Sequence, residues 1–455
     1  MSDPIYFCNN KYSSIKTLYF TKYFGTNHIL ILAFAFAIVA LPACDNLKNL
    51  KQAKNKVVTE ATIKSSEQVI ANGYRTDARF NRPVGIAIDK VGNLFISDQN
   101  NHVIRKITPD GKVINFAGQV MLINSYYFGS SFGHETEKNI ITINNNLKLD
   151  EDAINGAGLN AILLEPHEMV VDANSNLYLV DGPLKSVIRK ISPNGEVTTY
   201  TGKPSIQAYI NGKREDARFG FIEGIAFDHQ DNLFLVDSGN NAIRKVSPNG
   251  MVSTYAGNIP NANHSIQVGG AAVKDGVGID ARFNYPSAIA VDRDNNIYVG
   301  DSNGTVIRKI ATSAEVSTLA GTPYVDYPET EKDKRYYYKD GLGAVARFGR
   351  ELMALACDSF GNIYVADTNN SSIRKITPKG EVSTFAGSPF YLGNKEGSGK
   401  DARFYGPSAI VIDSQDNLYV TDQGDSTIRK ITPQTMVTHF AGKFIEIDSK
   451  RSDRN

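Results

Sequence analysis

Residues 275–286 read DGVGIDARFNYP and open the stretch that decides the fold. An apolar segment follows, then NNIYVGD at 295–301, VIRKI at 306–310 and VSTLAG at 316–321. The same order of motifs occurs six times in this chain of 455 residues. Self-similarity at a fixed period is typical of repeat architectures, in which stacked repeats form one unit. The repeats therefore outweigh the two or three domains that length alone suggests.

Each repeat holds four short segments of β type, separated by turn residues. In the first repeat they are Gly85–Ile88, Leu94–Ser97, Val103–Ile107 and Val113–Ala117. The first segment is almost wholly apolar, as expected of a strand buried on both faces. A four-stranded antiparallel sheet repeated at this period is a propeller blade. The six repeats run over 72–118, 155–202, 211–257, 275–321, 340–387 and 396–442.

These motifs resemble those of the NHL family, whose repeats share the Asp-Gly-Asn-Leu-Tyr-Val-x-Asp and Ile-Arg-Lys-Ile patterns. The resemblance covers residues 72–442. It implies an all-β, six-bladed propeller of four-stranded antiparallel blades, NHL-type, over residues 72–443. We expect the first and sixth repeats to meet and close the ring, which leaves no long exposed strand edge.

Residues present in every repeat have a role in the blade itself. An Arg in the third segment and an Asp at the end of the second recur together, which predicts charge-assisted pairing. The alternative is a ring of ligand-binding arginines. Five repeats also carry an Arg-Phe pair that we expect to wedge between blades. The arginines are Arg105, Arg189, Arg244, Arg308, Arg374 and Arg429, the aspartates are Asp98, Asp181, Asp237, Asp301, Asp367 and Asp422, and the pairs begin at Arg79, Arg218, Arg282, Arg347 and Arg403.

The N-terminus has the features of a bacterial lipoprotein signal. A basic start precedes the apolar run Ile29–Leu41, which is short for a membrane span but suits a signal peptide. Leu41-Pro42-Ala43-Cys44 resembles a lipobox, which implies cleavage after residue 43 and acylation of Cys44. The alternative is a retained anchor helix or an ordinary signal peptide with a chance Cys.

This interpretation divides the chain into a signal peptide (1–43), a lipid-anchored flexible tether (44–71), the propeller and a polar tail (444–455). Several acyl chains would hold the protein on membrane lipid, outside the cytoplasm, at the inner or the outer membrane. Cys357 would be the one remaining thiol, and we expect a small buried hydrophobe there rather than a disulfide. The net charge of +1 gives no reason to expect a nucleic-acid partner.

Insertions fall mainly between the end of one repeat and the start of the next, at 119–154, 258–274 and 322–339. Loops on a rigid scaffold often carry binding residues, and Tyr-rich loops form good contacts. We therefore expect a binding face there, with solubilising loops as the alternative. The candidate ligand-binding tyrosines are Tyr126, Tyr127, Tyr324, Tyr327, Tyr336 and Tyr337.

The second departure from the repeat lies just before the first strand of each blade. Most blades have a small or apolar residue there, as at Val84, Ser287, Leu352 and Ser408. Repeat two has His167 and Glu168 instead, repeat three has Glu223 and repeat five has Glu351. If these positions ring one mouth of the channel, His167 and Glu223 are candidate ligand-binding residues.

His167, Glu168 and Glu223 could alternatively hold a divalent metal, Zn or Ca, or perform acid–base catalysis. The family resemblance implies this alternative, because some NHL-type propellers are lyases with a channel metal held mainly by His; here only His167 sits at such a place. The segment 292–296 also has oxygen ligands at alternate positions, as calcium loops do. It lies in a turn common to all repeats, so turn chemistry explains it better.

The sequence thus favours a lipid-anchored binding or scaffolding propeller with no cofactor, which recognises a protein or glycan through its loops. An enzyme of lyase or lactonase type and a purely structural envelope protein are the alternatives.

Overall fold

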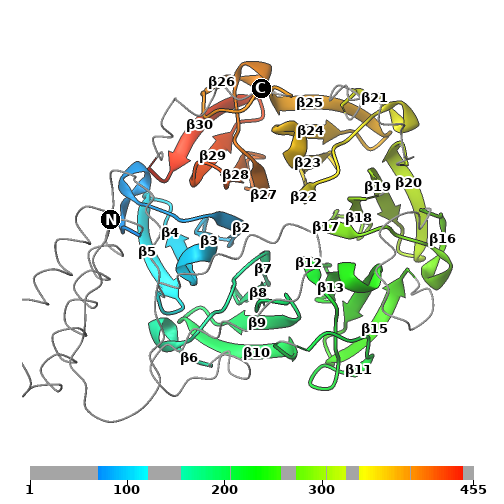
Figure 1. The fold of residues 1–455 in the computed structure, drawn as a ribbon, viewed down its shortest axis with the longest axis horizontal. Coiled ribbons are helices and arrows are strands. Elements are labelled where there is room, and N and C mark those ends of the chain that lie inside the picture. The colour runs from blue at the N-terminus through cyan, green and yellow to red at the C-terminus, as the bar shows by residue number, and fades with distance from the viewer. Residues whose placement is uncertain are drawn as a thin grey trace, which may run out of the picture. The chain divides into compact units, whose positions relative to one another are not determined.

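The computed structural model describes residues 70–120, 155–204, 206–257, 273–303, 305–323, 338–389 and 391–443. These residues form six antiparallel sheets arranged around a common centre (Figure 1). They lie within the compact unit Thr62–Asn455. In this part of the chain no helix is long and apolar enough to cross a membrane. The fold is an all-β, six-bladed propeller, as the repeats predict.

The four main strands of each blade run from the centre outward in chain order. The innermost strands are β2 (Pro83–Ile88), β7 (Met169–Val171), β12 (Ile222–Phe227), β17 (Pro286–Val291), β22 (Leu352–Cys357) and β27 (Pro407–Ile412). The second strands are β3 (Leu94–Asp98), β8 (Leu177–Asp181), β13 (Leu233–Asp237), β18 (Ile297–Asp301), β23 (Ile363–Asp367) and β28 (Leu418–Asp422).

The third strands are β4 (Val103–Ile107), β9 (Val187–Ile191), β14 (Ala242–Val246), β19 (Val306–Ile310), β24 (Ser372–Ile376) and β29 (Thr427–Ile431). The fourth strands are β5 (Lys112–Ala117), β10 (Glu196–Gly202), β15 (Met251–Ala256), β20 (Glu315–Gly321), β25 (Glu381–Gly387) and β30 (Met436–Ala441).

Each blade has a fifth strand of two residues, so the prediction of four-stranded blades was wrong. The fifth strands are β1 (Gly73–Tyr74), β6 (Gly156–Ala157), β11 (Gly212–Lys213), β16 (Gly276–Val277), β21 (Gly341–Leu342) and β26 (Gly397–Ser398). They come from the motif that opens each repeat and pair with the start of the fourth strand, as Gly276 pairs with Val316. Two residues are too few for a sequence period to show.

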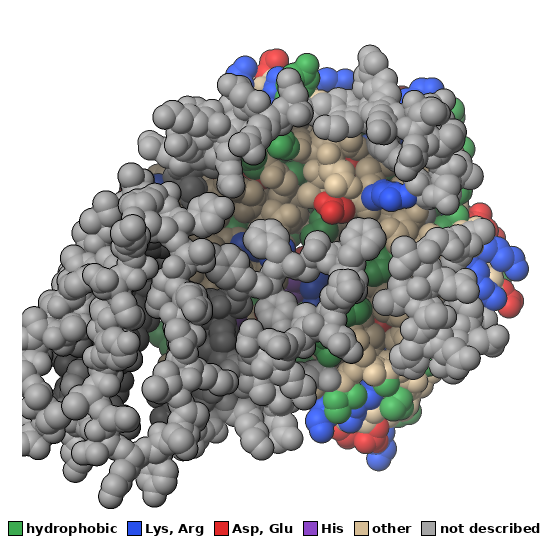
Figure 2. Space-filling view, viewed as in Figure 1, with side chains coloured by type: hydrophobic (Ala, Val, Ile, Leu, Met, Phe, Trp, Pro, Cys, Tyr) green, Lys and Arg blue, Asp and Glu red, His purple; other side chains and the backbone are tan. Residues whose placement is uncertain are grey.

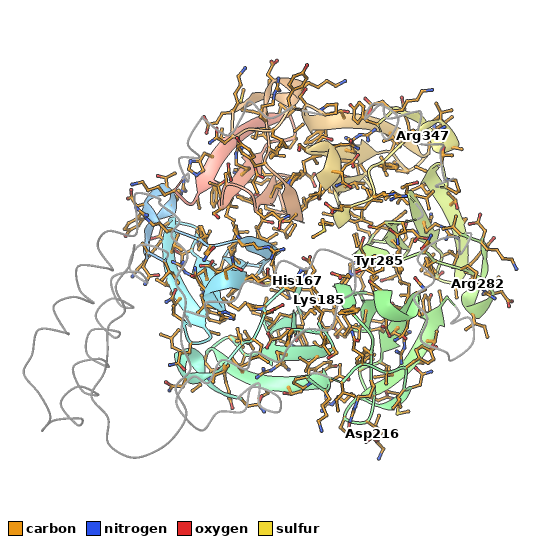
Figure 3. All side chains as sticks on the ribbon, in the orientation of Figure 1. His167, Lys185, Asp216, Arg282, Tyr285 and Arg347 are labelled. Carbon is orange, nitrogen blue, oxygen red and sulfur yellow. The ribbon has the colours of Figure 1, made fainter. Side chains whose placement is uncertain are left out.

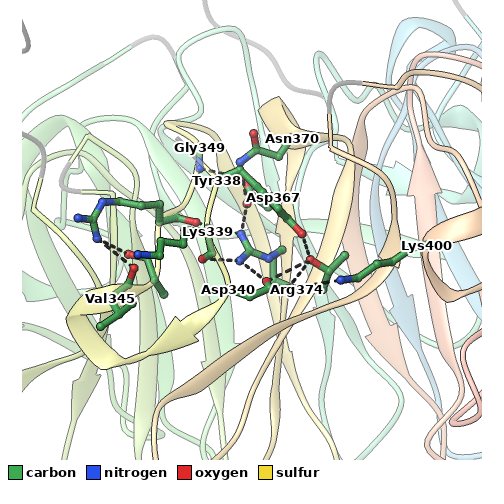
Figure 4. A network of polar contacts seen from close by, with 12 residues as sticks. Tyr338, Lys339, Asp340, Val345, Gly349, Asp367, Asn370, Arg374 and Lys400 are labelled. Carbon is green, nitrogen blue, oxygen red and sulfur yellow. Dashed lines mark hydrogen bonds and ion pairs between the residues drawn. The ribbon is translucent and has the colours of Figure 1, made fainter. Parts of the chain in front are cut away.

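A buried arginine holds this motif in place. In blade five the Arg374 guanidinium donates to Asp340 immediately before β21 and to Asp367 at the end of β23 (Figure 4). The six recurring arginines are all fully buried, which excludes the alternative of a ligand-binding ring. The predicted pairing of Arg with Asp is confirmed, and it lies within each blade. The pairs are Arg105–Asp98, Arg189–Asp181, Arg244–Asp237, Arg308–Asp301, Arg374–Asp367 and Arg429–Asp422.

The core lies between the blades. Phe283 packs in one apolar cluster with Phe234 of blade three and Ile297 of blade four. It therefore lies between the two blades, as predicted. The ring closes where β2 contacts β27, and Gly442 at the end of blade six donates its N–H to the Arg75 carbonyl of blade one over 3.0 Å. The prediction that the first and last repeats meet is confirmed.

Strand register places three kinds of connection on one face of the ring. In blade four a single row crosses the sheet from Pro286 to Asp301, then to Val306, then to Gly321. The inner strand begins at this edge, the second strand turns into the third, and the fourth strand ends. We call this edge of the blades the loop face. The turns between first and second strands and between third and fourth strands lie on the opposite face.

Candidate functional site

A polar cluster stands at the loop-face mouth of the central channel, and we call it the mouth cluster: Glu165, His167, Glu168, Lys185, Glu223 and Tyr285. Figure 3 shows His167, Lys185 and Tyr285 close to the centre of the ring, whereas Asp216, Arg282 and Arg347 lie at its outer parts. Figure 2 shows His and Lys or Arg side chains within the central opening. The cluster draws on three adjacent blades.

The ends of the inner strands define equivalent positions. Val171 pairs with Leu177 as Ile88 pairs with Leu94. His167 precedes Val171 by as many residues as Val84 precedes Ile88, so the two positions are equivalent. Glu223 takes the same position in blade three, as predicted. Glu351 does not: blade five has one extra residue before β22, so Met353 stands at this position and Glu351 one place before Leu352. Glu351 is exposed, and its N–H donates to Asn369 over 2.9 Å.

Glu168 stands where every other blade has Gly or Ala. The reason for the small residues is the neighbouring blade: a Cβ on Gly85 would lie 2.2 Å from the His167 carbonyl oxygen, and one on Gly224 would lie 3.0 Å from that of Ser287. In blade two the inner strand starts late, at Met169, so Glu168 stands just before this strand rather than within it. The equivalent residues are Gly85, Gly224, Ala288, Ala354 and Ala409.

An ion pair crosses from blade two to blade three. The Lys185 ammonium lies 2.6 Å from Glu223 Oε2, and these side chains are 22% and 13% exposed. The Tyr285 hydroxyl of blade four donates to Glu223 Oε1 over 3.2 Å. Both carboxylate oxygens of Glu223 are therefore engaged. Lys185 and Tyr285 have positive φ angles of 46° and 54°, a region that costs side-chain-bearing residues free energy and recurs at functional sites.

Burial controls the electrostatics of the cluster. Burial, and next the charge of Glu223, raise the pKa of Glu168 to about 8, although Lys185 opposes this shift. Burial, together with the charges of Lys185 and Arg82, holds the pKa of His167 well below its ordinary value. At neutral pH Glu168 is therefore largely a neutral acid and His167 a neutral imidazole. Burial and the Glu223 charge also raise the pKa of Tyr285.

Two polar groups in the cluster lack hydrogen-bond partners among the described residues. His167 is 7% exposed, and its Nδ1 atom has none. Glu168 is partly exposed, and its carboxyl has no hydrogen-bond partner within this part of the chain. The mouth cluster therefore retains polar groups that a ligand could satisfy.

The donor set does not fit a metal centre. Within the described ranges no three His, Cys, Asp or Glu side chains are grouped so that they could hold a metal ion. Both carboxylate oxygens of Glu223 are already engaged, one by the Lys185 ammonium and one by the Tyr285 hydroxyl. We therefore assign no metal to His167, Glu168 and Glu223, and the metal-dependent alternative stays a prediction.

The segment 292–296 forms a structural turn, as the sequence favours over a calcium loop. Asp292 Oδ1 accepts from the N–H groups of Asp294 and Asn296 over 2.9 and 2.8 Å, and its Oδ2 accepts from the Asn296 amide over 2.9 Å. Similar bonds recur at the equivalent aspartates of other blades. These turns line a cavity of about 330 Å³ on the opposite face, which also includes Cys357. Cys357 is a free thiol at the end of β22 and is only partly buried.

The long connections begin on the same face as the mouth cluster. Outer strands β5, β15 and β20 all end at the loop face, and the insertions follow them. After each insertion the chain enters the next blade at a two-residue strand. This strand pairs with the start of that blade's own fourth strand, at the end away from the loop face, as Gly276 pairs with Val316. Cys44 lies outside the described residues. So do the six candidate tyrosines, which are Tyr126, Tyr127, Tyr324, Tyr327, Tyr336 and Tyr337.

Sequence reasoning missed Lys185 and Tyr285. A signal for Lys185 existed in the length of a turn. The connection from β8 to β9 (182–186) is one residue longer than the connection from β3 to β4 (99–102). The extra residue falls in the turn of the same blade that carries His167 and Glu168. No comparable signal marked Tyr285, since aromatic and charged residues both occur at its position.

Comparison with known proteins supports the repeat assignment. Residues 210–432 match the model of the teneurin NHL domain. Teneurin-3 of Danio rerio is 26% identical over 392 residues, which cover 79% of this chain and 12% of Teneurin-3. The chain thus spans about an eighth of the length of this relative.

Two solved structures from Bacteroides thetaiotaomicron share the fold. A protein of unknown function has a TM-score of 0.52 and 17% identity, with 81% of this chain and 72% of that one covered. An auxiliary nutrient binding protein has a TM-score of 0.51 and 13% identity, with 80% and 70% covered. At these identities the likeness shows the fold alone.

Proposed function

We propose that this chain, an NHL-repeat β-propeller, is a lipid-anchored binding module that captures a protein or glycan outside the cytoplasm. The ligand surface would consist of the loop face around the channel mouth, with the connections 119–154, 258–274 and 322–339 and with His167 and Glu223. The anchor would be membrane lipid attached to Cys44.

One structural relationship carries the binding proposal. The mouth cluster and the starts of the three longest connections share the loop face, because the inner strands begin and the outer strands end in the same row of each blade. A rigid ring that presents variable connections beside polar groups without hydrogen-bond partners has the form of a ligand site. Fold alone does not assign the function.

Shortening the connections tests this proposal. Residues 203–211 join blades two and three without a long insertion, so they provide a template for replacing 119–154, 258–274 and 322–339. We expect each shortened chain to keep its β-type circular dichroism and to lose partner capture, measured by cross-linking in cells and on a glycan array. A Phe360→Ala chain, altered on the opposite face, is the matched control. Undiminished capture by a chain with all three replacements would refute the proposal.

The anchor is tested separately. We expect metabolic labelling with a palmitate analogue to be lost in Cys44→Ala and kept in Cys8→Ala, because Cys8 would leave with the signal peptide. Labelling that persists in Cys44→Ala would contradict acylation at this position. The result has no bearing on the loop face, so the two parts of the proposal stand or fall independently.

A further inference from the structure

The mouth cluster contains more carboxyl groups than its internal cation engages. Glu165, Glu168 and Glu223 all lie near Lys185. The Lys185 charge lowers the pKa of Glu165 and of Glu168, and its ammonium contacts Glu223 directly. Only Glu223 is hydrogen-bonded to the ammonium, at 2.6 Å. Arg82 is exposed and therefore screened by solvent. No cation among the described residues is in contact with Glu168.

We propose that the mouth cluster binds a cationic group, an ammonium or guanidinium of the partner, with Glu168 as its counter-ion and His167 as a hydrogen-bond acceptor. This inference rests on the proposed function and names the chemistry that the loop face recognises. The occupant we favour is a Lys or Arg side chain of a protein partner, which enters the channel mouth between blades two and four.

The unpartnered His167 nitrogen supports a ligand with several donors. An ammonium offers three N–H groups and a guanidinium five. One can bond the Glu168 carboxylate and another the His167 Nδ1, which accepts when the other ring nitrogen carries the proton. A carboxylate ligand offers no donor to this nitrogen. A lone hydroxyl has a single proton, so it can donate to only one of the two groups when Glu168 is ionised.

The neighbouring aromatic ring fits the same ligand. Tyr285 is 39% exposed and is held beside Glu223 by its hydroxyl bond. A cation near the face of a Tyr ring is attracted by the ring quadrupole. The Lys185 charge would repel a ligand cation, but the contact with Glu223 largely offsets this charge. Once ionised, Glu168 is then a carboxylate in the cluster that is not hydrogen-bonded to the Lys185 ammonium.

Cation binding in this cluster must depend on pH. A cation favours the ionised form of Glu168, whose pKa of about 8 in the free protein means that binding releases a proton at neutral pH. The groups that face Glu168 are Glu223 and Lys185, and His167 stays neutral. Affinity for a cation should therefore rise from pH 6.5 to pH 8. An anion would show the opposite dependence, and a neutral alcohol little dependence.

The test uses the full-length chain and three probes of one size: n-butylammonium, n-butanol and butanoate. Binding is followed through the Tyr285 ring signals in NMR titrations at pH 6.5 and pH 8. We expect n-butylammonium to bind best, more tightly at pH 8, and to bind about tenfold more weakly to Glu168→Ala. Alanine occupies this position in blades four to six, so the variant should fold. Glu351→Ala, which removes an exposed carboxylate at another blade, should bind as the unaltered chain does.

Three results would overturn the inference: preferential binding of butanoate, equal weakening in both variants, or no shift of Tyr285 with tens of millimolar n-butylammonium. Partner capture separates this failure from that of the proposed function. If capture of a partner needs the long connections but does not change in Glu168→Ala, the binding proposal stands and the cation site is refuted.

Discussion

Arg374 Nη1 donates to Asp367 Oδ2 over 2.9 Å, and neither side chain is exposed to solvent. The same guanidinium reaches Asp340 Oδ1 over 2.8 Å through Nη2, and it bonds the carbonyl oxygens of Arg347 and Lys339 at 3.0 Å (Figure 4). One side chain thus joins the second strand of the blade to the motif that opens the repeat. The arrangement explains why this Arg and this Asp recur together.

Replacing Arg374 by Leu should destabilise the propeller by about 3–5 kcal/mol, because Asp367 would keep a buried charge without its counter-ion. Chemical denaturation measures the change in free energy of unfolding. Lys379→Ala, which alters an exposed turn of the same blade, should change it by less than about 0.5 kcal/mol. Equal effects of the two substitutions would show that the buried pair has no special role.

Asp425 is a buried defect in blade six. In blade five Asn370 donates its amide to both carboxylate oxygens of Asp367 at 2.9 Å. Asp425 occupies the equivalent place beside Asp422 and cannot donate a hydrogen bond when it is ionised. Burial raises the pKa of both carboxyls, and the Asp425 charge raises the pKa of Asp422 further. We expect Asp425→Asn to stabilise the protein by about 1–2 kcal/mol at pH 7.

The pH dependence of this gain has a defined sign. A carboxyl whose pKa is raised by folding stabilises the protein at low pH and loses that contribution as pH rises from about 4. The advantage of Asp425→Asn should therefore be smallest near pH 4 and grow toward pH 7. The reverse substitution Asn370→Asp should destabilise blade five with the same trend. A gain that does not change with pH would argue against the shared-charge explanation.

The wedge between blades three and four gives a third prediction. Phe283 is 2% exposed, so Phe283→Ala should cost about 3–5 kcal/mol through lost burial and the cavity it leaves. Phe360 is 77% exposed in a turn, and Phe360→Ala should have little effect. Thermal unfolding followed by circular dichroism compares the two variants. Similar unfolding temperatures would mean that the blades repack without the wedge.

His167 should make the protein less stable in acid. Its pKa in the folded protein lies well below 6.5, whereas the unfolded chain binds a proton near 6.5. The stability that neutral His167 contributes is thus complete above pH 6.5 and is lost as pH falls below it. His167→Ser, which places the residue of blades four and six there, should lose less stability between pH 6.5 and 5. An unchanged acid dependence would contradict this burial.

The repeats made the ring predictable from sequence, because the spacing of Arg308, Asp301 and Phe283 recurs with the strands that hold them. The fifth strand was not predictable, since Gly276 and Val277 pair through backbone groups that leave no side-chain period. The error at Glu351 has a simple cause: one inserted residue shifts a position without changing the motifs on either side.

The site was only half predictable. His167, Glu168 and Glu223 depart from the repeat, and the structure brings them to one mouth. Lys185 and Tyr285 reach that mouth from a turn and from a residue before a strand, where left-handed backbone directs them. Such directions depend on backbone angles rather than residue type, so they emerge only in three dimensions.

Site-specific photo-cross-linking tests the binding account most directly. A benzoylphenylalanine at Asn303, an exposed residue of the turn between β18 and β19, probes the loop face, and one at Phe360 probes the opposite face. In the cells that make the protein, we predict a discrete cross-linked species from Asn303 that disappears when the connections at 258–274 and 322–339 are shortened, and none from Phe360. A discrete species from Phe360 alone, unaffected by the connections, would contradict the account.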